Sequence, residues 1–109
     1  MNAPLFDDLR VPPYSLEAEQ AVLGGLLISG RANDSSAWAV ASGLLIEEDF
    51  YRQDHRLIFR AIATLASQNH PLDILVIQNW LATHNELENA GGFAYLVTLV
   101  RETPSAANT

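Results

Sequence analysis

The feature that most constrains the fold is a periodic apolar pattern between residues 52 and 68. Apolar side chains recur there at intervals of three and four residues, so they share one face of an α-helix. They are Leu57, Ile58, Ala61, Ile62 and Leu65. The sequence Asn69-His70-Pro71 ends the pattern, because proline cannot continue a helix. A helix with one apolar face needs other elements to cover that face, so the pattern predicts a packed helical domain.

A first helix is predicted to begin at Ser15. Serine is a favourable N-cap, and Glu17 and Glu19 follow in the first turn, where the helix dipole favours negative charge. These two carboxylates diverge on a helix, so they are expected to complement the dipole and not to act as an acid–base pair. Gly24 and Gly25 lie inside this helix, and each costs about 1 kcal/mol relative to alanine. The usual compensation is a close backbone approach, so another helix is expected to cross there.

The polar segment 29–36, SGRANDSS, is predicted to be a loop. Asp34 or Ser35 can cap a second helix, which contains Trp38 and ends near Gly43.

Three further segments complete the predicted elements. Residues 47–49 are all acidic and are expected to form a turn, from which Glu48 can pair with Arg52. Asp73 can cap a helix that continues to Leu81. The last predicted helix, residues 93–100, is apolar nearly all round, which predicts deep burial.

Together these segments predict an all-α fold, a compact bundle of about five to six short helices. Residues 1–13 are predicted to form a flexible N-terminal tail, because Pro4 and the pair Pro12-Pro13 block helix formation. Residues 14–104 are predicted to be the globular helical domain. Residues 105–109 are predicted to be the start of a following helix that is truncated in this chain.

The composition excludes several kinds of site. The chain has no cysteine, which removes disulfides, thiol nucleophiles and cysteine-containing zinc sites. It has no lysine, which a phosphate-binding P-loop and Schiff-base chemistry both need. The net charge is −7, whereas domains that bind a nucleic-acid backbone are usually basic, so we do not expect this chain to hold DNA alone.

The apolar runs are much shorter than the roughly 20 residues that cross a bilayer, and the N-terminus lacks the apolar segment of a signal peptide. A cytoplasmic location without a membrane partner is therefore expected.

The three histidines, His55, His70 and His84, are not spaced as metal ligands. No two share a helical turn, and no acidic residue accompanies them at the spacing of a zinc site. His55 is expected to be a histidine at the edge of the core with a hydrogen-bond partner. Gly91-Gly92 follows a helical turn and not a strand, so it is expected to separate two helices and not to bind phosphate. No catalytic, cofactor-binding or metal-binding residue is predicted.

Two sets of residues are candidates for an interaction surface. Arg52, Arg56 and Arg60 step by four along a second face of the helix at residues 52–68. They suit an acidic partner or a phosphate, although a solvated face held by nearby acids is favoured, because charged helix faces are usually of this kind. Trp38 and Trp80 suit interface anchors, since tryptophan is enriched at binding hot spots. Each also lies in an apolar helical pattern, so a core position is the default.

The order of these features resembles the N-terminal domain of DnaB-type replicative DNA helicases, and the resemblance spans residues 11–108. No single motif is decisive, but their order and spacing together are specific. Segment 29–36 is longer than the usual connection of that family. The segments that carry the resemblance are Val11-Pro12-Pro13, Ser15-Leu16-Glu17-Ala18-Glu19-Gln20, Val22-Leu23-Gly24-Gly25, Glu48-Asp49-Phe50-Tyr51, His55 with Ile58-Phe59, Pro71-Leu72-Asp73, Leu87, Gly91-Gly92-Phe93-Ala94-Tyr95-Leu96 and Thr103-Pro104-Ser105-Ala106-Ala107-Asn108.

The resemblance implies an interaction domain in DNA replication. Members of the family form hexameric rings, in which the N-terminal domains make a collar, associate with one another and receive the primase. A helicase loader is a further candidate partner. A motor domain outside this chain binds ATP and magnesium and contacts the DNA, so this chain is expected to have no cofactor, no ATPase activity and no unwinding activity.

Two alternatives remain. A helical DNA-binding or adaptor domain without an attached motor would place the arginine stripe on phosphates, and its DNA binding would weaken steeply with salt. A small helical enzyme is disfavoured, because cysteine, lysine and any convergent acid–base pair are all missing.

Overall fold

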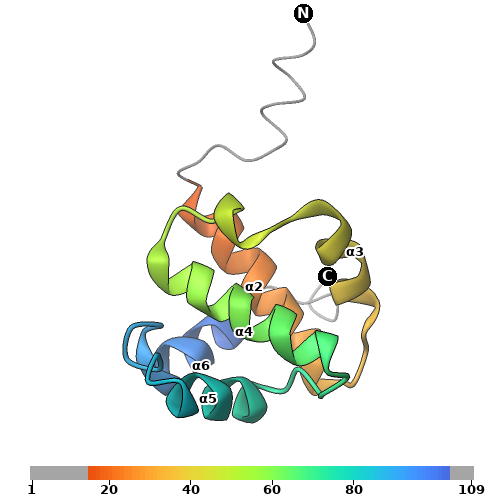
Figure 1. The fold of residues 1–109 in the computed structure, drawn as a ribbon. Coiled ribbons are helices and arrows are strands. Elements are labelled where there is room, and N and C mark those ends of the chain that lie inside the picture. The colour runs from red at the N-terminus through yellow and green to blue at the C-terminus, as the bar shows by residue number, and fades with distance from the viewer. Residues whose placement is uncertain (1–14, 104–109) are drawn as a thin grey trace, which may run out of the picture.

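Helices make up the domain in the computed structural model, which describes residues 15–103 (Figure 1). Five α-helices and one 3-10 turn are present in this range, and it contains no strand, which confirms the all-α fold class. The predicted tail at residues 1–13 and the predicted helix start at residues 105–109 lie outside it. The elements are α2 (Leu16–Arg31), α3 (Ser36–Leu44), η1 (Glu47–Asp49), α4 (Gln53–Ser67), α5 (Ile74–Thr83) and α6 (Gly92–Glu102).

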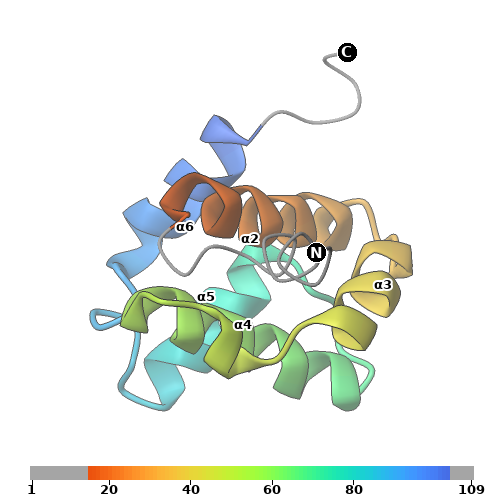
Figure 2. The same ribbon diagram turned by 90° about the horizontal axis from the view of Figure 1, so that it is seen from above.

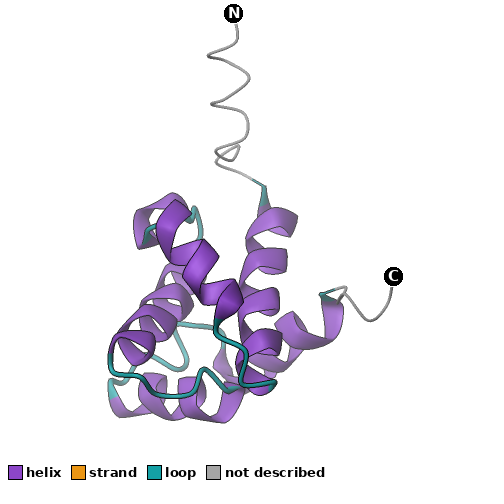
Figure 3. Cartoon of the chain, turned by 90° about the vertical axis from the view of Figure 1, so that its right-hand side faces the viewer, coloured by secondary structure: helices purple, strands orange, loops and turns teal. Residues whose placement is uncertain are grey.

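Helix α4 contacts α2 on one side and α5 on another (Figures 1 and 2). Helix α2 also packs along α6, and α3 lies against α2 at the opposite end from α6 (Figures 2 and 3). The periodic apolar face of α4 is buried as predicted, and it meets leucines and isoleucines from three other helices. The largest fully buried apolar side chains are Leu23 and Leu27, Ile58 and Ile62, Ile77 and Leu81, and Leu96 and Leu99.

The predicted helix starts are confirmed at two positions. The Ser15 hydroxyl oxygen accepts a hydrogen bond from the amide of Ala18 at 3.3 Å, and the Asp73 carboxylate accepts one from the amide of Leu75 at 2.7 Å. Gly91 begins α6 with a φ of 103°, in the left-handed region that favours glycine. The glycine pair therefore separates the turn at residues 86–90 from α6, as the sequence indicated.

Gly24 is the point where α6 crosses α2. A Cβ atom there would lie 2.5 Å from the carbonyl oxygen of Leu99, so only glycine permits the approach. The predicted close crossing is therefore confirmed at Gly24. The prediction is wrong for Gly25, where a Cβ would meet nothing within 4 Å.

The predicted loop at residues 29–36 is largely wrong. Helix α2 continues to Arg31, so only residues 32–35 connect it to α3. The sequence misled because Ser29 and Gly30 are weak helix formers. Packing overrides that preference, since Gly30 is buried where a Cβ would overlap the backbone of Leu72.

Deep burial of the last helix is also wrong. Of its apolar residues only Leu96 and Leu99 are fully buried, while Phe93 is exposed. Helix α6 lies at the surface against α2 and α5, so only one of its faces meets the core.

No helix within residues 15–103 combines the length and the apolar character needed to cross a membrane.

Candidate functional site

The predicted arginine stripe lies along the outer side of α4 and at its N-terminus, and intramolecular contacts engage all three guanidinium groups. Arg52 donates two hydrogen bonds to the Asp54 carboxylate, at 3.0 and 2.6 Å. The predicted pairing of Arg52 with Glu48 is therefore wrong. Asp54 lies only two residues from Arg52, and its carboxylate accepts two N–H donors of the planar guanidinium group. The Nε atom of Arg56 donates to the Phe50 carbonyl oxygen at 2.6 Å.

Arg60 forms an ion pair with Glu47, and its Nε atom donates to Oε1 at 3.1 Å. The hydrogen bond from Arg60 lowers the pKa of the Glu47 carboxyl group below its usual value. The pair ties η1 to α4. These contacts leave the guanidinium groups part-exposed, so whether the stripe also meets a partner stays a prediction.

The two tryptophans are half-buried and pack against the core. The ring of Trp38 lies 5.4 Å from that of Phe59. The ring of Trp80 stacks on His84 at 3.9 Å. Each therefore covers core residues with one side, and a role as an interface anchor stays a prediction.

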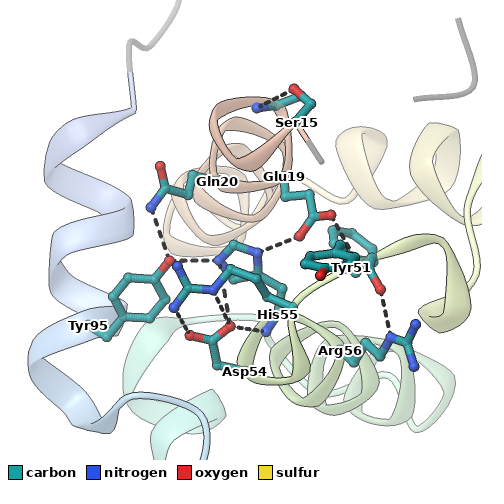
Figure 4. A network of polar contacts seen from close by, with 11 residues as sticks. Ser15, Glu19, Gln20, Tyr51, Asp54, His55, Arg56 and Tyr95 are labelled. Atoms are coloured by element: carbon teal, nitrogen blue, oxygen red, sulfur yellow. Dashed lines mark hydrogen bonds and ion pairs between the residues drawn. The ribbon is translucent and has the colours of Figure 1, made fainter. Parts of the chain in front are cut away.

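A buried polar network joins α2, α4 and α6 (Figure 4). His55 is completely buried, and its Nδ1 atom lies 2.7 Å from Oε1 of Glu19, which is itself 95% buried. The Nε2 atom of His55 lies 2.6 Å from the hydroxyl oxygen of Tyr95. Gln20 donates to that same hydroxyl at 3.1 Å, and Glu19 Oε2 accepts from the amide of Tyr51 at 2.6 Å. Four side chains from three helices are thus held together.

Both ring nitrogens of His55 have partners in this network. The Nδ1 atom faces Oε1 of Glu19. The Nε2 atom faces the Tyr95 hydroxyl, which also accepts a hydrogen bond from the amide group of Gln20. Every buried side-chain nitrogen and oxygen among residues 15–103 has a hydrogen-bond partner, so the network is satisfied.

Tyr95 lies at the margin of this network. Burial raises the pKa of its phenol above the usual 10.0, and the hydrogen bond from Gln20 partly opposes the shift. The Arg52 guanidinium carbon lies 5.8 Å from the centre of the Tyr95 ring, so the cation covers the ring. The charged groups beside the network are therefore Glu19 and Asp54, which face His55, and Arg52, which lies over Tyr95.

The network corrects one prediction and confirms another. Glu19 was expected to serve the helix dipole alone, but it is buried and accepts hydrogen bonds from His55 and from the backbone at Tyr51. His55 was expected to be a core-edge histidine with a partner, and it is. The partner was missed because 36 residues separate the two side chains. The sequence did contain a signal that Glu19 is buried. Glu19 lies four residues before Leu23, so both side chains share the inner face of α2.

The network can connect helices, but its histidine and carboxylate are closed to a substrate. Residues 15–103 contain no group of three or more side chains that could hold a metal ion. The polar atoms of His55 and Glu19 are engaged by each other, by the Tyr95 hydroxyl and by the amide of Tyr51. We interpret the network as a polar connection between α2, α4 and α6.

The outer side of α3 is an apolar helix surface that the other residues within the range 15–103 leave uncovered. Of this helix only Ala41 is buried. Val40 is 63% exposed and Leu44 is 74% exposed. We define the α3 outer face as Ser36, Ala39, Val40, Gly43 and Leu44, all exposed.

The class that these features define is a small all-α domain with a sealed polar network and an uncovered apolar helix face. The family of DnaB-like helicase N-terminal domains matches residues 11–109. This chain therefore belongs to that family.

Individual relatives agree with the match. The replicative DNA helicase DnaB of Pasteurella multocida is 45% identical over 98 residues, covering 90% of this chain and 20% of that protein. The replicative DNA helicase DnaB of Geobacillus stearothermophilus is 43% identical over 99 residues, covering 91% of this chain and 21% of that protein. The chain thus spans about a fifth of the length of the curated relatives it matches.

A solved structure gives the same fold. The N-terminal domain of DnaB helicase from Mycobacterium tuberculosis superposes with a TM-score of 0.78 at 37% sequence identity. The match covers 90% of this chain and 66% of that chain. The similarity in sequence and in fold confirms the resemblance on which the sequence analysis relied.

Proposed function

We propose that this chain is the collar domain of a hexameric replicative DNA helicase, where it associates with other subunits and receives the primase. The observation that carries the proposal is the match to replicative helicases over 90% of this chain but only 20% of the relative. One domain of a longer helicase would produce that pattern. The fold likeness to an isolated DnaB N-terminal domain supports it.

The chemistry of the described residues supports a role in protein contacts. The buried acid and histidine are closed to a substrate, and the chain carries a net charge of −7. A domain of that charge is repelled by DNA phosphates. An apolar helix face remains uncovered, and such faces mark sites of protein association.

The rest of the proposal concerns the longer helicase of which this chain would be one domain. A motor domain would bind ATP and magnesium and move along DNA in the cytoplasm, and a helicase loader would be a further partner. This chain by itself would hydrolyse no ATP. An ATPase assay on the 109-residue chain tests that statement.

The direct test uses the full-length helicase with and without residues 15–103. We expect deletion to weaken the hexamer, measured by native mass spectrometry, and to abolish the stimulation of unwinding by primase. A deletion variant that forms normal hexamers and still responds to primase would overturn the proposal. The intact helicase purified in parallel is the control for both readouts.

DNA binding through the arginine stripe is the competing function. The contacts of Arg52 to Asp54 and of Arg60 to Glu47 neutralise two of the three guanidinium groups within the chain. The test is binding of single-stranded DNA to the 109-residue chain. The competing function would be favoured if the affinity falls steeply with salt and falls again when all three arginines are changed to glutamine.

A further inference from the structure

A groove opens where the C-terminal ends of α2 and α4 meet beside α3 (Figures 1 and 2). Its volume is about 440 Å³, which lies within the usual range of ligand pockets. The groove is lined by Gly30 and Asn33 from the end of α2, Ala66 and Asn69 from the end of α4, and Trp38 from α3. It shares no lining residue with the arginine stripe or the buried polar network, so it is a separate site.

The two helix ends give the groove a negative electrostatic potential. The C-terminus of a helix carries the equivalent of about half a negative charge, because its last carbonyl groups point outwards. Both helices end at an asparagine in the left-handed conformation, Asn33 with a φ of 62° and Asn69 with a φ of 61°. Helix α5 ends in the same way at Asn85, but it does not line this groove. Two such ends around one groove favour a positively charged ligand.

Asp34 adds a full negative charge to the lining of the groove. Its Oδ1 atom accepts hydrogen bonds from the amide and the hydroxyl of Ser36, at 2.9 and 2.7 Å. These bonds lower the pKa of the Asp34 carboxyl group below its usual value, so it is ionised at neutral pH. Its Oδ2 atom has no partner among residues 15–103, and no arginine in that range lines the groove. The chain has no lysine, so the charge awaits a cation from outside.

We propose that this groove binds an aliphatic polyamine, in which methylene groups separate two or more ammonium groups. One ammonium group would pair with Asp34 at the end of α2, and another would lie at the end of α4 beside Asn69. The methylene groups would pack on Trp38, whose ring also attracts cations. The inference goes beyond the proposed collar function and does not depend on it.

The lining of the groove suits an organic cation better than a metal ion. Asp34 is the only carboxylate among the lining residues, whereas magnesium and calcium need several oxygen ligands. Trp38, Ala66 and Leu72 contribute apolar surface that a metal ion would not use. Because the charges are exposed, we expect a weak site, with a dissociation constant of about 1 mM at low ionic strength and weaker binding in salt.

Titration of the ¹⁵N-labelled 109-residue chain with spermidine, followed by NMR, tests the proposal. We expect chemical-shift changes that saturate and are concentrated at residues 30–39 and 66–72, the two segments that line the groove. Hexanediol has an uncharged methylene chain and should leave these signals in place. Sodium chloride at the same ionic strength is the control for general screening of charge.

Three variants locate the charge that binds the ligand. Asp34→Asn should weaken spermidine binding about threefold to fivefold, because the amide oxygen still accepts from Ser36 but the charge is lost. The matched control is Glu88→Gln, which removes one negative charge in the turn before α6, at the other end of the domain (Figure 1). It should leave the affinity unchanged. Arg31→Gln should strengthen binding about twofold, since Arg31 lies in the last turn of α2 and repels an ammonium group there. The NMR spectra also report whether each variant stays folded.

The proposal is overturned if the shifts spread over acidic residues throughout the domain, or if Asp34→Asn and Glu88→Gln weaken binding equally. Either result would mean that spermidine is attracted only by the net charge of −7. Nα-acetyl-lysine methylamide tests the other source of an ammonium group. If it binds the groove more tightly than spermidine does, the ligand is a lysine side chain of a protein and the polyamine assignment is wrong. The collar function would survive each result, because it depends on the separate deletion test in the full-length helicase.

Discussion

The buried polar network contains an acid and a histidine where apolar side chains are usual, whereas the α3 outer face contains valine and leucine where charged side chains are usual. The network is satisfied within the chain, since Glu19, His55 and Tyr95 bond to one another. The exposed Val40 and Leu44 of the α3 outer face are not covered in this way by other residues within the range 15–103. The comparison teaches that a buried polar group stabilises this fold when its partners lie in the same chain, while an exposed apolar group points to a partner outside it.

The largest expected effect comes from removing the acid of the network. Glu19→Ala removes the carboxylate that faces His55 Nδ1 in the core and that accepts from the part-buried amide of Tyr51. Each unsatisfied buried donor costs about 1–3 kcal/mol, so we expect a loss of about 3 kcal/mol in the free energy of unfolding. Urea denaturation measures it. The matched control is Glu17→Ala, because Glu17 is exposed in the same helical turn and should change stability by less than about 0.5 kcal/mol.

If Glu19→Ala and Glu17→Ala cost the same, the network contributes no special stability and the comparison fails. Glu19→Gln sharpens the test. The glutamine oxygen can still accept a hydrogen bond from His55, but its NH2 group then faces the backbone N–H of Tyr51, so two donors meet. Its cost should lie between those of the two alanine variants.

A smaller effect is expected when the network loses only the hydroxyl of Tyr95. Tyr95→Phe removes the hydroxyl that bonds with His55 Nε2 and accepts from Gln20, at a cost of about 1–2 kcal/mol. The raised pKa of Tyr95 makes this cost pH-dependent. A group whose pKa is higher in the folded state contributes stability that is full below its unfolded pKa and is lost as the pH rises through the folded value.

The difference in unfolding free energy between wild type and Tyr95→Phe should therefore be constant below pH 10 and decrease above it. Urea denaturation at a series of pH values gives this difference. A difference that grows above pH 10 would mean that the phenol ionises more easily in the folded protein, against its burial.

The surface ion pair should contribute less than the network. Glu47→Gln breaks the pair with Arg60, and exposed pairs contribute about 0–1 kcal/mol. Because the pKa of Glu47 is lowered in the folded state, its contribution is present above the usual value of 4.5 and is lost as the pH falls through the folded value. Wild type and Glu47→Gln should thus converge in acid, and a difference that persists at pH 2 would contradict this account.

The smallest effect is expected on the α3 outer face. Leu44→Ser should change the unfolding free energy of the dilute monomer by less than about 0.5 kcal/mol, because Leu44 is 74% exposed and contributes little to the core. A loss of 2 kcal/mol would show that α3 is held by Leu44 within the chain. The α3 outer face would then stabilise the monomer itself, and its contrast with the buried polar network would no longer hold.

The sequence predicted those parts of the fold that depend on local chemistry. The caps at Ser15 and Asp73, the apolar face of α4 and the crossing at Gly24 each follow from rules about one segment. The end of α2 at Arg31 could not be predicted from such rules. Gly30 is held in the helix by its contact with Leu72, which lies 42 positions later in the sequence. The same limit hid the pairing of Glu19 with His55.

The candidate surface could be predicted only in part. The stripe of Arg52, Arg56 and Arg60 was visible in the sequence, but its contacts with Asp54, Phe50 and Glu47 depend on how η1 and α4 pack. The helix that carries Trp38 was also singled out, yet Trp38 faces Phe59 and the uncovered side chains are Val40 and Leu44. Which side of an apolar helix meets the core is decided by its neighbours, and these are set by the tertiary fold.

The central claim is that this chain is one domain of a replicative helicase, and reading the gene beyond the codon for Thr109 tests it most directly. The account predicts an open reading frame that continues through a helical hairpin into a strand followed by G-x-x-x-x-G-K-[ST], the phosphate-binding loop of a motor domain. A stop codon at or near that position would contradict it. The domain would then be a free-standing relative of the collar, and an adaptor role would replace the helicase.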